Sequence, residues 1–92
     1  MDRNRMNVLL ASVLTTLGGL EEEGIVGAPE GPLYAGLMGH GASYGDWEDV
    51  RAILLQAKLV TSTGHCMRLT LAGWEMVSKI EAATEAPYRA RA

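Results

Sequence analysis

The sequence predicts a mostly helical α+β fold, in which three helices lead into a short β-hairpin and a C-terminal helix follows. Apolar residues recur at helical spacing through most of the 92-residue chain. The spacing changes to alternation only between about Leu59 and Thr70. The length and the 48% hydrophobic content are typical of one globular domain. We therefore expect a single domain over residues 1–92, with its core at about residues 6–84 and a flexible tail at residues 85–92.

The first helix is amphipathic. Its apolar arc on a helical wheel comprises Met6, Leu9, Leu10, Val13, Leu14, Leu17 and Leu20. This arc is wide enough either for deep burial within the domain or for burial shared with a second subunit. Gly18-Gly19 weakens the helix end, and the three acids from Glu21 to Glu23 oppose the helix macrodipole at a C-terminus. These three acids are either a last helical turn or a solvated loop, and we prefer the second interpretation, in which the helix stops early.

Turn-forming residues separate this helix from a second, shorter one. Ile25-Val26 is interpreted as a very short strand. The turn from Gly27 onwards then places Pro32 at the first position of a helix, where proline is favoured. The second helix is expected to include residues 33–38 and to end at Gly39-His40-Gly41.

Ser43 is expected to cap a third helix, because Asp46 follows three residues later in the capping-box position. The two faces of this helix differ in character. Its buried stripe is expected to contain Trp47, Val50, Ile53, Leu54 and Ala57. Its opposite face carries Gly45, Glu48, Asp49, Ala52 and Gln56.

The alternating segment predicts a hairpin of minimal length. Its strands are expected at residues 59–61 and 66–70, joined by a turn at residues 62–65 that contains Gly64. Thr70 can then cap a last helix, which Pro87 is expected to end. The buried stripe of that helix is expected to contain Gly73, Met76, Val77, Ile80 and Ala83, with Trp74 at its edge.

The order and spacing of these elements resemble winged helix-turn-helix domains. The likeness covers about residues 6–84. It is carried by Leu33 to Met38, Gly39 to Ser43, Trp47 to Leu55, Lys58-Leu59-Val60, Gly64-His65 and Arg68-Leu69-Thr70-Leu71-Ala72-Gly73. In such domains the helix that begins here at Ser43 would enter the DNA major groove. The turn at residues 62–65 would be the wing, which touches the DNA backbone or minor groove.

The resemblance therefore implies a non-enzymatic protein that binds nucleic acid, duplex DNA in particular, with a role in transcription regulation. The implied nucleic-acid-binding residues are Ser43, Tyr44, Arg51, Lys58, Thr63, His65 and Arg68. The three basic residues among them would bind phosphate, and Tyr44 would approach the bases. A homodimer formed through the first and last helices is expected, because one recognition helix with so little positive charge would bind poorly. That helix departs from the pattern, because Glu48 and Asp49 on its exposed face repel phosphate.

The charge distribution keeps a second hypothesis open. The net charge is −3, and residues 21–57 carry seven acidic side chains against a single arginine, whereas a nucleic-acid-binding domain usually shows a basic face. The alternative is a protein–protein interaction or dimerisation module of the same fold that binds no nucleic acid. Convergence of five basic residues on the wing side would favour nucleic acid, and their dispersal would favour the interaction module. These five residues are Arg3, Arg5, Lys58, Arg68 and Lys79.

The sequence predicts no metal, no cofactor and no enzyme. His65 and Cys66 would point to opposite faces of a strand, and no CxxC or HExxH spacing occurs. The glycines at positions 39, 41 and 45 do not match a phosphate-binding loop. Arg3 and Arg5 precede an apolar run, but no signal-peptide cleavage site follows. With one cysteine and no stretch of about 20 apolar residues, a cytoplasmic protein without a membrane span is expected.

Overall fold

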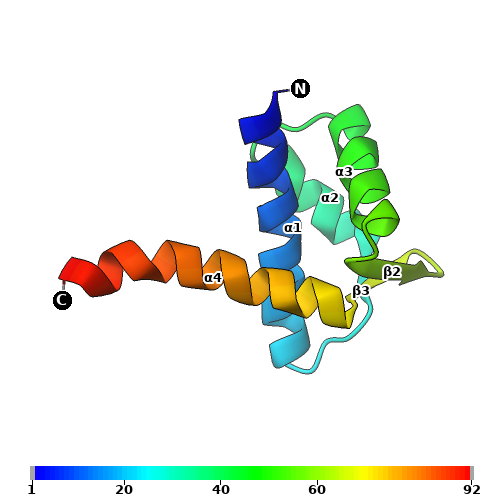
Figure 1. The fold of residues 1–92 in the computed structure, drawn as a ribbon. Helices are drawn as coiled ribbons and strands as arrows, with labels where there is room; N and C mark the ends of the chain where they lie inside the picture. The colour runs from blue at the N-terminus through cyan, green and yellow to red at the C-terminus, as the bar shows by residue number, and fades with distance from the viewer. Residues whose placement is uncertain (1, 92) are drawn as a thin grey trace.

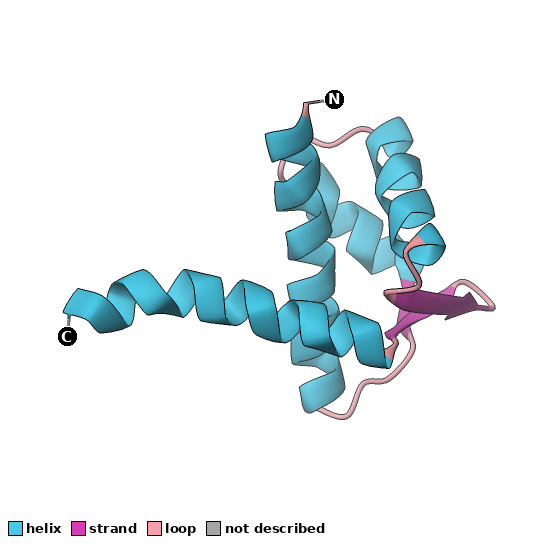
Figure 2. Cartoon of the chain, viewed as in Figure 1, coloured by secondary structure: helices cyan, strands magenta, loops and turns pink. Residues whose placement is uncertain are grey.

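The computed structural model describes the backbone of residues 2–91 and the side chains of residues 2–83. In that part of the chain the elements are α1 (Arg3–Glu22), β1 (Ala28–Pro29), α2 (Glu30–Met38), α3 (Tyr44–Gln56), β2 (Val60–Thr63), β3 (Cys66–Leu69) and α4 (Leu71–Arg91). The expected fold class is confirmed, because the chain is mostly helical with a small three-stranded antiparallel sheet (Figure 1, Figure 2). No helix among the described residues is long and apolar enough to cross a membrane.

The sheet has the strand order β1-β3-β2, and both pairings are antiparallel. β2 and β3 are joined by the two residues Gly64 and His65, whose φ angles are 57° and 60°. Positive φ at both positions is characteristic of a type I′ turn, whose twist suits a tight hairpin. The turn is shorter than expected, because Ser62 and Thr63 belong to β2 and pair with β3.

The core lies where α1 meets the other three helices and the hairpin (Figure 1). Its largest fully buried side chains come from all four helices and from β3: Leu9, Val13, Leu14, Leu17, Leu37, Val50, Leu54, Met67 and Val77. Each such side chain contributes about 1.5–3 kcal/mol by leaving water. Because α1 contacts every other helix and β3, it is the organising element of the domain.

α1 does not stop early, so that prediction is wrong. The helix continues through Gly18-Gly19 to Glu22. Gly18 is a packing residue, because a Cβ atom there would lie 3.2 Å from Val77 Cγ1 on α4. Glu21 Oε2 accepts a 2.7 Å hydrogen bond from the backbone N–H of Leu69 at the end of β3. Contacts with α4 and β3 therefore stabilise the last turn of α1, although its glycines and acidic residues disfavour a helix there.

The first strand and the start of α2 also differ from prediction. Ile25 and Val26 are about half exposed and form no strand, and pairing begins instead at Ala28, which is buried opposite Met67. α2 begins at Glu30 with Pro29, not Pro32, at its start. The backbone N–H of Glu30 donates to the carbonyl of His65 at 2.9 Å. Pairing with β3 thus draws the helix start toward the hairpin.

The structure confirms the predicted capping box of α3. Ser43 Oγ accepts from the N–H of Asp46, and the Asp46 carboxylate accepts from the N–H of Ser43. The buried stripe is narrower than predicted. Trp47, Val50 and Leu54 are buried, whereas Ile53 is 37% exposed and Ala57 is exposed. The residues 53 and 57 lie at the edge of the stripe, where no other element covers them.

Thr70 caps α4 as expected, since its Oγ1 accepts from the N–H of Gly73 at 3.0 Å. Val77 is buried, but Met76, one position before it, is 36% exposed. Ala83 is exposed because α4 extends away from the body of the domain toward its end (Figure 1). The helix continues past Pro87 to Arg91, so the predicted end at Pro87 is wrong.

Three helices end in the same backbone motif. In each, two N–H groups past the helix return to carbonyls of the last turn: Gly24 and Ile25 after α1, Gly41 and Ala42 after α2, and Lys58 and Leu59 after α3. This Schellman motif requires a left-handed residue, which is usually glycine. Gly24 and Gly41 meet that requirement, but α3 uses Lys58, with a φ of 59°. The Lys58 backbone is held there because its carbonyl accepts from Thr70 Oγ1 at 2.7 Å.

We therefore expect Lys58→Gly to raise the free energy of unfolding by about 0.5–1 kcal/mol, because glycine adopts left-handed φ without the steric cost of a Cβ. Urea denaturation would measure the change. Lys58→Ala is the matched control, since it removes the same charge and keeps the Cβ. Equal stability of the glycine and alanine variants would contradict this account.

Candidate interaction and nucleic-acid surfaces

The structure divides the seven candidate nucleic-acid-binding residues into two groups. Ser43 and Tyr44 lie at the start of α3, whereas Lys58, Thr63, His65 and Arg68 lie on or beside the hairpin. All six are exposed. Arg51 lies on α3 between the two groups and is half-buried.

The start of α3 offers little polar chemistry for a ligand. The Ser43 hydroxyl is engaged in the cap, where it accepts from the N–H of Asp46 at 3.1 Å. Tyr44 is 57% exposed, and its ring meets Tyr34 edge-on with centroids 5.3 Å apart. Tyr34 also packs against Trp47 at 6.4 Å. The Tyr44 ring therefore packs against Tyr34 and leaves the rest of its surface in solvent.

Arg51 is held by an ion pair within the chain. Its Nε donates to Glu30 Oε1 at 2.6 Å, and its Nη2 lies 3.4 Å from Ser62 Oγ. The Ser62 hydroxyl in turn donates to Glu30 Oε2. This cluster, which we call the Glu30 cluster, joins the start of α2, the middle of α3 and β2. Sequence analysis missed Glu30 because its partners lie 21 and 32 residues away, where no spacing rule applies.

The charges of the Glu30 cluster stabilise each other. Burial raises the pKa of Glu30, but the hydrogen bonds from Arg51 and Ser62 and the charges of Arg51 and His65 outweigh it and hold that pKa below its usual value. The hydrogen bond to Glu30 raises the pKa of Arg51. The positive charge of Arg51 is therefore compensated within the chain, which leaves α3 with no uncompensated basic side chain.

A hollow of about 410 Å³ separates the outward face of α3 from the hairpin turn. It is lined by Glu30, Tyr44, Trp47, Glu48, Arg51, Ala52 and His65. In a winged-helix complex, nucleic acid would lie against this region. Glu48 at its edge and Asp49 beside it are exposed, so the local charge is unfavourable for phosphate.

The hairpin provides the exposed basic groups. Arg68 alternates along β3 with the buried residues Met67 and Leu69, so it occupies the outward face, opposite Thr61 of β2. Lys58 lies between the end of α3 and the start of β2. Within the part of the chain whose side chains are described, the Arg51–Glu30 pair is the one salt bridge, so Lys58 and Arg68 carry uncompensated charges.

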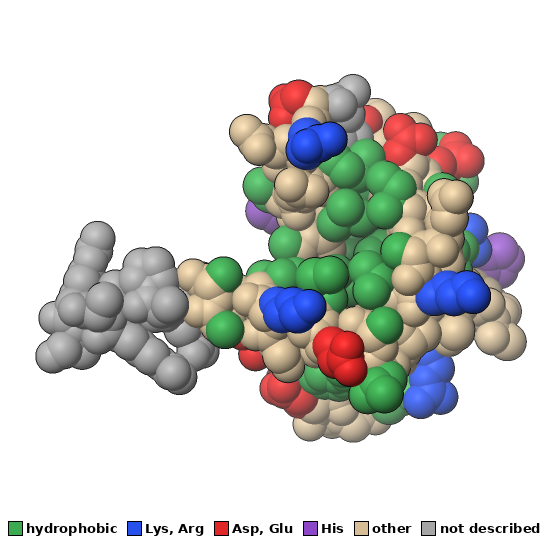
Figure 3. All heavy atoms as spheres, in the orientation of Figure 1, with side chains coloured by type: hydrophobic (Ala, Val, Ile, Leu, Met, Phe, Trp, Pro, Cys, Tyr) green, Lys and Arg blue, Asp and Glu red, His purple; other side chains and the backbone are tan. Residues whose placement is uncertain are grey.

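Convergence of five basic residues on the hairpin would favour nucleic-acid binding, but these residues lie apart. Lys58 and Arg68 flank the hairpin, Lys79 lies on α4, and Arg3 and Arg5 lie at the start of α1. Figure 3 shows separate basic side chains rather than one basic surface on the face in view. The dispersal favours the interaction module over nucleic-acid binding.

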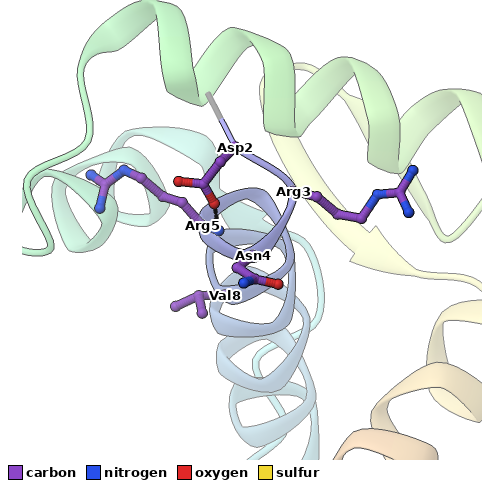
Figure 4. Close-up of a pocket in the computed structure, with 5 residues that line it drawn as sticks. All are labelled: Asp2, Arg3, Asn4, Arg5 and Val8. Carbon is purple, nitrogen blue, oxygen red and sulfur yellow. Dashed lines mark hydrogen bonds between the residues drawn. The ribbon is translucent and has the colours of Figure 1, made fainter.

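The hollow at the start of α1 has a volume of about 630 Å³ and is lined by Asp2, Arg3, Asn4, Arg5 and Val8. Figure 4 shows that Arg3 and Arg5 point to opposite sides of the helix. Asp2 Oδ1 accepts from the backbone N–H of Arg5 at 2.8 Å, and Arg5 Nη2 donates to the carbonyl of His40 at 3.2 Å. The arginines therefore do not form an anion site. Among the described residues, no cluster of His, Cys, Asp and Glu could hold a metal ion.

An apolar groove lies in the angle between α1 and α4. Its volume is about 340 Å³, and it is lined by Asn7, Leu10, Ala11, Leu14, Leu59, Met76 and Ile80. Figure 3 shows apolar side chains gathered at this angle. Asn7 is the one polar side chain of the lining, so the groove suits an apolar protein surface rather than a phosphate or a sugar.

Comparisons of the chain with protein-family models, with curated proteins and with solved structures found no match.

Proposed function

We propose that this chain is a protein–protein interaction module of the winged-helix type, and that it associates with a second copy of itself through α1 and α4. The observation that supports this proposal most is the apolar groove between these two helices, which leaves Leu10, Leu59 and Ile80 only half-buried and Met76 36% exposed. A domain of about 90 residues buries little of its apolar surface alone, so covering this groove would add stability that a small core lacks. The acidic face of α3 would remain in water.

The element order supports the winged-helix part of the proposal. Three helices precede the hairpin and one follows it, and β1, which lies before α2, pairs with the second strand of the hairpin. The resemblance to winged-helix domains depends on this order of elements. Fold alone does not select between binding protein and binding nucleic acid.

Nucleic-acid binding is the second candidate function, and the uncompensated charges of Lys58 and Arg68 favour it. If the chain binds nucleic acid, the hairpin, with Thr63 and His65 at its turn, would contact the phosphate backbone of duplex DNA. α3 would contribute little, because Arg51 is paired and Glu48 and Asp49 are acidic.

Titration of the protein with random-sequence duplex at two salt concentrations distinguishes the two functions. The interaction module predicts a homodimer that shows no salt-dependent binding at micromolar protein. If the protein does bind, Lys58→Ala with Arg68→Ala should weaken binding to all sequences and reduce the slope of log affinity against log salt by about 1 per residue. Arg5→Ala with Lys79→Ala is the control of equal charge. Binding that only the hairpin pair weakens would overturn our first proposal in favour of the second.

A further inference from the structure

α4 extends well beyond the residues that pack in the core. Its last buried residue is Val77, and Figure 1 shows the helix continuing away from the body to its end at Arg91. We call residues 81–91 of this helix the arm. Glu81, Ala82 and Ala83, the part of the arm whose side chains are described, are all exposed. Most helical stability in proteins comes from tertiary packing, so a second surface that covers the arm would stabilise it.

The groove and the arm are similar in length. The arm has eleven residues and is about 16 Å long at 1.5 Å per residue. The α1 wall of the groove runs from Asn7 to Leu14, about 12 Å by the same rise. The small exposed side chains of Ala82 and Ala83 would allow another helix to approach within about 8 Å. The arm is therefore long enough to fill a groove, and the side chains of Ala82 and Ala83 are small enough to enter it.

The position of α4 also determines which molecule can supply the arm. Met76 and Ile80 of α4 form one wall of the groove, and the arm begins directly after Ile80. The arm therefore starts at the groove of its own chain but leads away from it (Figure 1). A two-fold axis beside Ile80 would place the arm of each copy in the groove of the other, and such reciprocal contacts are the usual form of a homodimer interface.

We infer that two copies of this chain exchange their α4 arms, each arm lying along the Asn7–Leu14 face of the partner's α1. This inference rests on the self-association proposed above and adds the place and the occupant of the interface. The exchange covers the exposed sides of Leu10, Met76 and Ile80 in both copies. Because both copies give and receive an arm, the buried area approaches the roughly 800 Å² per partner of a stable interface more closely than one arm in one groove would.

Sedimentation equilibrium of the full chain and two variants tests the inference. The wild type is expected at twice its 9.9 kDa mass. Ala83→Glu, on the arm, and Met76→Glu, on the groove wall, should each raise the dissociation constant of the dimer at least tenfold, because each places a charge in an apolar interface. Ala83 is exposed in the single chain, so its substitution leaves the folded monomer intact.

Ala72→Glu is the matched control, because Ala72 is also an exposed alanine of α4 but lies in its first turn, far from the arm. It should leave the dimer unchanged. Circular dichroism of each variant confirms that the helices are retained. A dimer that persists in both Ala83→Glu and Met76→Glu would overturn the arm exchange while self-association stands. A monomeric wild type would overturn both, whatever the result of the duplex titration.

Discussion

Gly73→Ala is expected to reduce the free energy of unfolding by at least about 3 kcal/mol, which is a large share of the roughly 5–14 kcal/mol typical of a domain of this size. A Cβ atom at Gly73 would lie 2.1 Å from the carbonyl oxygen of Leu59 and 3.0 Å from Leu69 Cδ2. The first of these is a backbone atom that has little freedom to move, because it accepts a 3.0 Å hydrogen bond from the N–H of Thr70. α4 would therefore have to move away from the hairpin.

Urea denaturation followed by circular dichroism would measure this loss. Gly19→Ala is the matched control, because Gly19 also lies in a helix and its added Cβ would meet no atom within 4 Å. That change should stabilise the protein by about 0.5–1 kcal/mol through the helix preference of alanine. A Gly73→Ala protein within about 1 kcal/mol of the wild type would show that α4 does not sit this close to Leu59.

Glu30→Gln is expected to cost about 1–2 kcal/mol at pH 7, because it removes the charge that compensates Arg51 and one acceptor of the Glu30 cluster. Glu30 is buried, with its side chain 10% exposed, whereas the Arg51 side chain is 36% exposed and can still reach water. The cost is therefore smaller than for a fully buried pair. Glu48→Gln, an exposed carboxylate on the adjacent face of α3, is the control and should change stability by less than about 0.5 kcal/mol.

The effect of Glu30 should depend on pH in one direction. In the folded protein the pKa of Glu30 lies below its ordinary value of 4.5, so the ionised carboxylate stabilises the folded state at every pH above about 4.5. This contribution is lost as the pH falls through the folded pKa. The stability difference between wild type and Glu30→Gln should therefore shrink in acid, measured by urea denaturation between pH 7 and pH 3. A difference that is constant over this range would contradict the role of the Glu30 charge.

Features that depend on neighbours in the chain could be predicted from the sequence. The capping box of Ser43 and Asp46 and the cap of Thr70 join residues three positions apart, so their residue types alone indicate them. The hairpin could be located from its alternating pattern, because side chains of a strand alternate between the core and solvent. Its turn was predicted two residues too long, since the pattern does not show how far pairing extends.

The candidate surfaces were less predictable. The positions of Lys58 and Arg68 beside the hairpin followed from the element order. The pairing of Arg51 with Glu30 did not, and it removes the charge that made Arg51 a phosphate candidate. The dispersal of Arg3, Arg5 and Lys79 could not be inferred either, because it depends on where α1 and α4 lie relative to the hairpin.

The sequence by itself determined that four helices and one hairpin would form and that Ser43 and Thr70 would cap the third and fourth helices, because caps, turns and apolar periodicity act over a few residues. Only the tertiary structure decided the rest. α1 continues through Gly18-Gly19 because Gly18 lets it pack closely against Val77 of α4. Glu21 near its end accepts a hydrogen bond from Leu69, which lies 48 residues further along the chain. β1 forms at Ala28 rather than Ile25 because β3 is available there to pair with it. Such contacts join distant segments, so their stabilising energy is absent from any local pattern and appears only when the chain is packed.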